Sequence, residues 1–163
     1  MKLLKNIFST LVVTVFLASA AFAQGSILGT ADNPRVIEVV GTDNMKFDVT
    51  TMDAQPGETI KVVLKVVSRI PKQAMAHNIV FLYSGVDMKA FVNASAKARD
   101  NKYIAPELED QVLATTDLAG GGETVEVTFT VPMVPGDYEY VCSFPGHFYG
   151  GMKGVLTVKD IGI

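Results

Sequence analysis

The chain has 163 residues, of which 48% are hydrophobic and 19% are charged, and its 14 basic and 17 acidic residues give a net charge of −3. This size fits one domain with a proper hydrophobic core. The mildly acidic balance argues against nucleic-acid binding, which needs a basic surface.

The first 23 residues have the pattern of a secretory signal peptide. Lys2 and Lys5 precede an uncharged apolar run, which ends in Ala21-Phe22-Ala23 with small residues beside the expected cleavage site. A membrane anchor is the alternative, but the run is short for a bilayer span. We expect cleavage after Ala23, export to the periplasm or another compartment outside the cytoplasm, and a single mature domain of residues 24–163. This mature chain keeps 12 basic against 17 acidic residues and no apolar run long enough to cross a membrane.

Alternating hydrophobic and polar residues predict seven or eight strands along the mature chain. In residues 124–131, valine and phenylalanine alternate with threonine and glutamate. Such alternation between turn signals is typical of antiparallel strands with one buried face. The clearest strands are predicted at residues 35–40, 45–50, 60–66, 77–83, 124–131, 137–141 and 154–159. The pattern predicts an all-β Greek-key sandwich, in which Tyr138 is expected to fix a corner through its hydroxyl.

Residues 86–104 break this alternation. The segment is rich in alanine and charge, and it places Met88, Phe91 and Val92 at helical spacing with Pro106 beyond it. We predict a short helical insertion that covers one edge of the sandwich.

The single cysteine, Cys142, is unusual in a chain that we expect to be exported. Oxidising compartments favour paired cysteines. A buried inert thiol is the simplest explanation, because cysteine is among the most often buried residue types. Metal ligation, nucleophilic catalysis and an intermolecular disulfide are the alternatives.

The loop after Cys142 carries further candidate metal ligands. His147 and Met152 follow at intervals of five residues, with glycine-containing bends between them, and His77, the only other histidine, begins a predicted strand. Two histidines and a cysteine with a weak axial methionine form the ligand set of a blue-copper electron-transfer site. Taken singly, His77 fits a core histidine and Met152 fits a core residue. The joint pattern uses every histidine and the one cysteine of the chain.

The sequence resembles the small blue (type 1) copper proteins of the azurin, auracyanin and plastocyanin-like cupredoxin family. CSFPGH followed by GMKGVLTV is similar to the metal-binding loop of azurins and auracyanins, and MAHNIV is similar to the segment around their upstream histidine. The resemblance extends from about Val36 to Lys159. It implies a cupredoxin-like fold with one copper per chain. It also implies a monomeric one-electron carrier, not an enzyme, which meets its donor and acceptor proteins transiently.

By this resemblance, His77, Cys142 and His147 are the strong copper ligands and Met152 is the weak axial one. The Ala76 carbonyl then lies opposite Met152 as a weak fifth contact. The interval between His147 and Met152 is one residue longer than in azurin and is similar to that of auracyanin. Azurin also carries a disulfide, which a chain with one cysteine cannot form.

Residues beside these ligands are candidates for tuning and docking. Asn78 is placed to tie the His77 strand to the Cys142 loop, and the Phe144 N–H is placed to bond the thiolate; such contacts fix ligands and tune a metal. Asn78 fits a plain turn residue equally well. A redox partner would suit an exposed apolar patch around His147. The candidates for this patch, some of which fit the end of the core instead, are Met75, Phe144, Pro145, Phe148 and Tyr149.

Two other functions use the same residues. A copper storage or delivery protein would share the ligands, but such carriers favour methionine-rich or histidine-rich tracts, which this chain lacks. A multicopper enzyme needs further histidines, whereas a thiol hydrolase would pair Cys142 with His147 as its base. In the hydrolase, Met152 and His77 would have no role.

Overall fold

The computed structural model describes residues 28–159. The predicted signal peptide, residues 1–23, and its cleavage site lie outside the described residues. Within residues 28–159, no helix is long and apolar enough to cross a bilayer.

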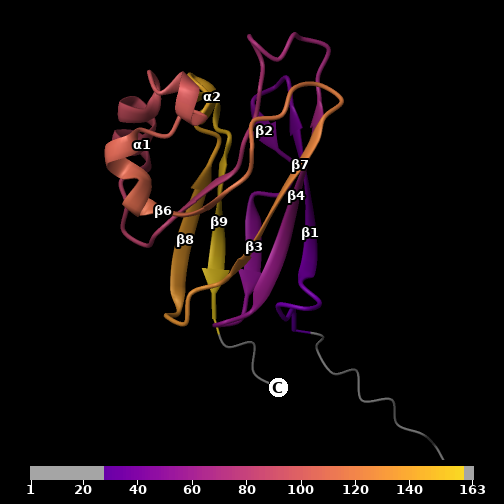
Figure 1. Ribbon diagram of the computed structural model, residues 1–163, viewed down its shortest axis with the longest axis vertical. Coiled ribbons are helices and arrows are strands. Elements are labelled where there is room, and N and C mark those ends of the chain that lie inside the picture. The colour runs from indigo at the N-terminus through magenta and orange to yellow at the C-terminus, as the bar shows by residue number, and fades with distance from the viewer. Residues whose placement is uncertain (1–27, 160–163) are drawn as a thin grey trace, which may run out of the picture.

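Two β-sheets pack against each other and confirm the predicted all-β sandwich (Figure 1). The first sheet has the strand order β2-β1-β4-β7 and the second β3-β9-β8-β5-β6. β1 pairs in parallel with β4, and β3 pairs in parallel with β9, whereas the other neighbours are antiparallel. The strands are β1 (Arg35–Thr42), β2 (Lys46–Phe47), β3 (Thr51–Ala54), β4 (Thr59–Val67), β5 (Val80–Leu82), β6 (Val112–Thr115), β7 (Thr124–Thr130), β8 (Gly136–Val141) and β9 (Lys153–Val158).

β4 shows how the sequence pattern builds the core. Ile60, Val62 and Leu64 point inward and are fully buried, because side chains alternate between the faces of a strand. Lys61 and Lys65 point outward and form ion pairs with glutamates on the neighbouring strands β7 and β1. The hydrophobic residues of the sequence pattern thus lie in the core, and the polar residues between them face the solvent.

Tyr138 in β8 fixes a corner of the sandwich, as predicted. Its ring is buried, and its hydroxyl donates a hydrogen bond of 2.9 Å to the carbonyl of Val134, in the connection from β7. The bond satisfies the phenol at the edge of the core and anchors the start of β8.

The predicted helical insertion is also present. It comprises α1 (Met88–Ser95) and the 3₁₀ helices η1 (Arg99–Asn101) and η2 (Pro106–Gln111). The Asp87 side chain caps α1 by accepting hydrogen bonds from two backbone N–H groups of its first turn. The insertion buries its apolar face in a second core against β5 and β8, formed by Val80, Leu82, Phe91, Val92, Ile104 and Val141.

The nine strands found within residues 28–159 exceed the seven or eight predicted from the sequence. β6 has no period-two signal, because all four of its residues are half-buried. The strand predicted at residues 45–50 is only two residues long in the structure, as β2, and β3 follows it as a separate short strand that the sequence did not predict.

Candidate metal centre

Three potential metal-donor atoms converge at the end of the sandwich that carries α2 (His147–Gly150). The Nδ1 atoms of His77 and His147 and the Sγ of Cys142 lie within 4.8 Å of one another. The two nitrogens are 3.1 Å apart, and the sulfur is 3.4 Å from His147 Nδ1 and 3.9 Å from His77 Nδ1. The three residues are 0%, 3% and 0% exposed in the order His77, His147 and Cys142. The cluster is therefore enclosed by protein.

Backbone pairing sets the positions of two of these donors. His77 exchanges two hydrogen bonds of 2.8 Å with Ala119, just before β5 begins. Cys142 directly follows β8, and its N–H donates to the Met152 carbonyl at 3.0 Å. Since β5 and β8 are neighbours in the second sheet, the sheet itself brings the imidazole and the thiol together.

The third donor comes from a compact turn of helix. His147 begins α2, Gly151 caps its C-terminus, and the Met152 N–H donates to the His147 carbonyl at 3.0 Å. Gly151 has φ +93°, a left-handed conformation that favours glycine as a helix stop. This turn accommodates the long interval between His147 and Met152.

Met152 lies beside His77 against the first sheet. Met152 is fully buried, and a Cβ atom added to Gly41 in β1 would lie 3.1 Å from Met152 Cε and 3.2 Å from the Cδ2 of the His77 ring. A side chain at this position would therefore displace the methionine, the imidazole or both. Glycine allows this close approach of the β1 backbone to the two side chains.

Asn78 clamps the two ligand segments together. Its Oδ1 accepts from the Ser143 N–H at 2.9 Å, and its Nδ2 donates to Ser143 Oγ at 2.9 Å and to the Lys102 carbonyl at 3.1 Å. The sequence pointed to the bond toward the Cys142 loop but not to Lys102. Lys102 and Tyr103 both have left-handed backbone angles, φ 55° and 58°, a rare conformation for residues other than glycine. Through this bend the helical insertion becomes part of the support of the site.

The Phe144 ring packs against His147 and Tyr103. Its ring centroid is 4.7 Å from that of His147 and 5.1 Å from that of Tyr103.

Burial raises the pKa of the Cys142 thiol to about 12, although the backbone N–H groups of Asn78 and Phe144 favour the thiolate. In the metal-free protein the thiol is thus protonated at neutral pH, and a metal must displace this proton when it binds.

Burial also lowers the pKa of His77 and His147 to about 4 each. The Asp43 carboxylate partly opposes this effect at His77, whereas the charge of His77 adds to it at His147. Both imidazoles are consequently neutral at pH 7, which is the form that binds metal ions.

The metal-free protein should lose stability as the pH falls from about 6.5 to 4.5. The unfolded chain takes up protons on its histidines near pH 6.5, whereas the folded chain resists protonation until about pH 4. At 1.36 kcal/mol per pKa unit, the two groups together lower the free energy of unfolding by at most roughly 7 kcal/mol across the full shift. Urea unfolding of the metal-free protein at several pH values measures this.

The His147→Gln variant is the control for this pH dependence, because it should lose about half of the slope. A flat profile between pH 6.5 and 4.5, or the same slope in the variant, would contradict the prediction.

The donor set fits copper. A thiolate and a neighbouring thioether are soft ligands that suit Cu(I), and imidazole binds both Cu(I) and Cu(II). No carboxylate belongs to the cluster of potential ligands in residues 28–159, which makes a site for a hard cation such as Mg²⁺ or Ca²⁺ a poor match.

The other predicted site residues lie around this cluster. Ala76 is 2% exposed and lines a neighbouring cavity. Of the candidate docking residues, Tyr149 and Pro145 are exposed, while Met75 and Phe148 are half-buried. His147 is more enclosed than a ligand that reaches the surface, because Phe144 stacks on its ring. Sequence patterns did not reveal Gly41, Ser143, Lys102 or Tyr103, because each acts through backbone geometry or a contact between segments far apart in the chain.

Known proteins share both the sequence and the fold. Residues 35–159 match the family described as copper binding proteins, plastocyanin/azurin family. Azurin-1 of Alcaligenes xylosoxydans xylosoxydans is 39% identical over 128 residues, covering 76% of this chain and 97% of its own length. Auracyanin-B of Chloroflexus aurantiacus is 43% identical over 148 residues, covering 89% of this chain and 61% of its own length.

Solved structures agree with these relatives. The structure of auracyanin A, a "blue" copper protein from Chloroflexus aurantiacus, has a TM-score of 0.68 and 32% identity, and covers 77% of this chain and 99% of its own. The reduced auracyanin of Roseiflexus castenholzii has a TM-score of 0.67 with 32% identity, and covers 76% and 96%. The match of sequence, fold and donor set makes copper the cofactor, and the chain belongs to the plastocyanin/azurin family of copper-binding proteins.

Proposed function

We propose that the chain is an exported one-electron carrier that holds one copper ion through His77, Cys142 and His147, with Met152 as the weak axial ligand. The observation that carries the proposal is the convergence of two imidazole nitrogens and one thiol sulfur within 4.8 Å in a buried cluster. Bound copper supplies a single-electron couple between Cu(II) and Cu(I). The azurin and auracyanin relatives support the same function.

The protein's own contribution is to hold the donors in one arrangement in both oxidation states. The Asn78 clamp, the backbone pair between His77 and Ala119, and the close contact at Gly41 all limit movement of the donors. A site that changes little when the electron moves has a low reorganisation energy. Burial also keeps water from the donors, so the proposed role is to carry an electron rather than to transform a substrate.

The proposed route for the electron passes through the α2 end of the sandwich. His147 lies in the loop with exposed Pro145 and Tyr149, and half-buried Phe148 and Met75 complete a candidate apolar docking patch. Such a patch suits brief encounters with donor and acceptor proteins. In this proposal the mature protein is a single domain of residues 24–163 that acts as a monomer, and the Ala76 carbonyl is a weak contact opposite Met152.

The visible absorption and electron paramagnetic resonance spectra of the Cu(II)-loaded protein test this function. We expect an intense blue or green colour from charge transfer between the thiolate and copper, with a type 1 resonance signal. A colourless Cu(II) complex would overturn the proposal. Slow metal exchange with fast electron self-exchange is expected for a carrier of electrons, whereas fast metal exchange with slow self-exchange would indicate a copper delivery protein instead.

A further inference from the structure

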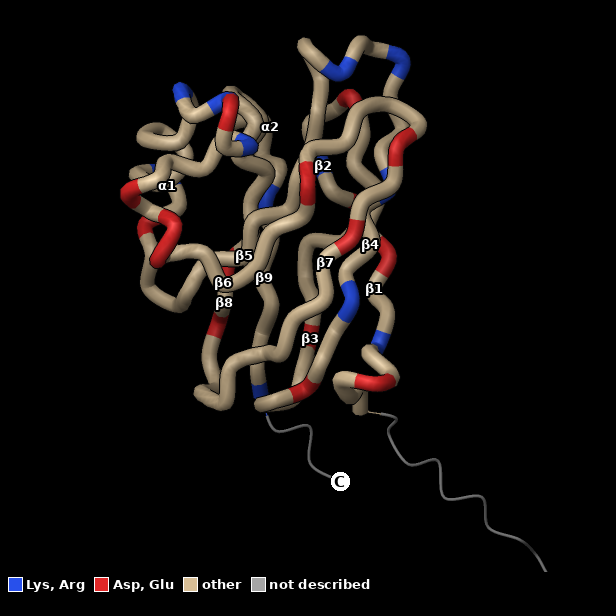
Figure 2. Tube along the Cα trace, in the orientation of Figure 1, with Lys and Arg blue, Asp and Glu red and all other residues tan. Residues whose placement is uncertain are grey.

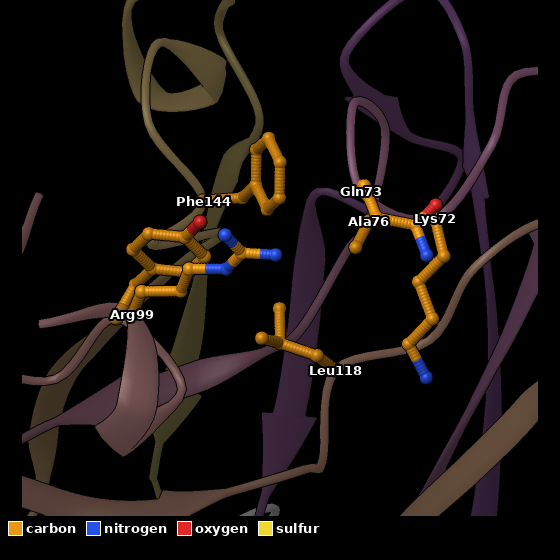
Figure 3. Close-up of a pocket in the computed structure, with 7 residues that line it drawn as sticks. Lys72, Gln73, Ala76, Arg99, Leu118 and Phe144 are labelled. Carbon is orange, nitrogen blue, oxygen red and sulfur yellow. The ribbon is translucent and has the colours of Figure 1, made fainter.

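A cavity beside the candidate metal centre has no role in holding the proposed ligands. It has a volume of about 220 Å³, well above the ~30 Å³ that one water molecule occupies, and it is lined by Lys72, Gln73, Ala76, Arg99, Tyr103, Leu118 and Phe144 (Figure 3). Ala76 precedes the ligand candidate His77, and the Phe144 ring packs on that of His147. A group bound in this cavity is therefore close to both histidines.

Arg99 gives the cavity its charge. Figure 3 shows the Arg99 guanidinium extending into the space between Phe144 and Leu118. Among residues 28–159, no carboxylate forms an ion pair with Arg99, and its side chain is exposed. Lys72, the other cation of the cavity, is neutralised by Glu123, whose carboxylate accepts a hydrogen bond of 2.7 Å from its ammonium group.

The surrounding loops also carry a cation that, unlike Arg99, is paired with a carboxylate. Figure 2 shows Lys and Arg residues on the loops on both sides of the α2 end, together with carboxylates. Lys102, close to Arg99 in the chain, pairs with Asp117. Arg99 thus stands out as a guanidinium, a group with five donors, that lines a cavity with aromatic walls and has no ion-pair partner in the described part of the chain.

We propose that this cavity receives an acidic side chain of a protein redox partner, with Arg99 as the anchor. A carboxylate matches the planar fork of a guanidinium and forms two parallel hydrogen bonds with it. Phe144 and Tyr103 provide apolar walls that partly exclude water, which strengthens such a charged contact. The site rests on the proposed electron-carrier function, since it places the partner next to His147.

The position of the cavity means that this contact would orient the partner as well as bind it. Charge pairs at an interface mainly steer the encounter and fix the orientation of the partners. Arg99 shares the cavity with Ala76, which directly precedes His77, and with Phe144, whose ring packs on that of His147, so an anchor in this cavity aligns the partner with the metal-bearing end. The apolar patch around His147 alone gives no such directional contact.

Nuclear magnetic resonance titration of the ¹⁵N-labelled, Cu(I)-loaded protein tests the site. A tetraglutamate peptide should shift the amide resonances of Tyr103, Leu118 and Phe144 at low ionic strength, and tetraglutamine should not. The Arg99→Gln variant should bind tetraglutamate about tenfold more weakly, in line with the loss of a hydrogen bond to a charged group. The Arg99→Lys variant, which keeps the charge but lacks the fork, should bind with intermediate affinity.

Arg69→Gln is the matched control, because Arg69 is an exposed cation on the same end that does not line this cavity. It should bind tetraglutamate like the parent protein. The proposal is overturned if tetraglutamate causes no shifts, if the shifts persist in Arg99→Gln, or if they are centred on other residues. Absence of the blue or green colour would instead overturn the electron-carrier function, so the two failures are distinguishable.

Discussion

The Cys142→Ser variant is expected to lose the intense visible colour of the Cu(II)-loaded protein while it keeps the same fold. The absorption depends on charge transfer from a thiolate to copper, and a serine hydroxyl is a harder donor with no such transition. Copper(I) affinity should also fall by more than the ~10–100-fold that substitutions in outer contacts of metal sites typically cause. Absorption spectra and competition with a copper(I) chelator measure the two effects.

The fold of this variant should be retained, because Cys142 forms no disulfide and serine is slightly smaller. Circular dichroism of the metal-free variant provides the control. A variant that stays intensely coloured would show that Cys142 does not bind the metal. A loss of colour with a lost fold would be uninformative by itself, and Cys142→Ala then serves as the second test, because it removes the thiol without placing a hydroxyl in the core.

The second large effect is expected from Asn78→Ala. Asn78 is fully buried, and its removal leaves the Ser143 N–H without its partner and takes one of the donors from the Lys102 carbonyl. A buried polar group left unpaired costs about 1–3 kcal/mol. We therefore expect the metal-free variant to lose roughly 2–4 kcal/mol of unfolding free energy.

Copper affinity should fall as well, by about 10–100-fold, because the clamp fixes the spacing between the His77 and Cys142 segments. Urea unfolding and chelator competition measure these losses. Asn93→Ala is the matched control: Asn93 is exposed and accepts one hydrogen bond from the Tyr149 hydroxyl, so its loss should cost less than about 1 kcal/mol. Equal effects of the two substitutions would contradict the role assigned to Asn78.

The parts of the fold that the sequence predicted are those with a strong local signal. β7 and β4 alternate strictly between hydrophobic and polar residues, and the core follows that alternation. The insertion was recognisable because helical spacing replaced period two at Met88, Phe91 and Val92. β6 lacked any such signal, since tertiary packing leaves each of its residues half-buried.

The candidate site likewise has residues that the sequence predicted and residues that it did not. The cluster of candidate ligands could be predicted because His77, Cys142 and His147 are chemically distinctive and include every histidine and cysteine in the chain. Gly41 has no side chain that would indicate a role in the site, and its importance follows from the approach of β1 to the opposite sheet. The burial of His147 under Phe144 likewise depends on how the loop after Cys142 closes, which spacing alone does not determine.

The contact at Gly41 also couples the metal centre to the assembly of the whole sandwich. His77 is fixed by its backbone pair beside the second sheet, whereas Gly41 belongs to β1 in the first, and a methyl group on Gly41 would lie only 3.1 Å from Met152 Cε and 3.2 Å from His77 Cδ2. Closely packed interiors transmit displacement instead of absorbing it. We therefore expect that a change in the spacing between the two sheets would move the candidate copper ligands. The colour of the copper-loaded protein would then report mechanical deformation of the protein.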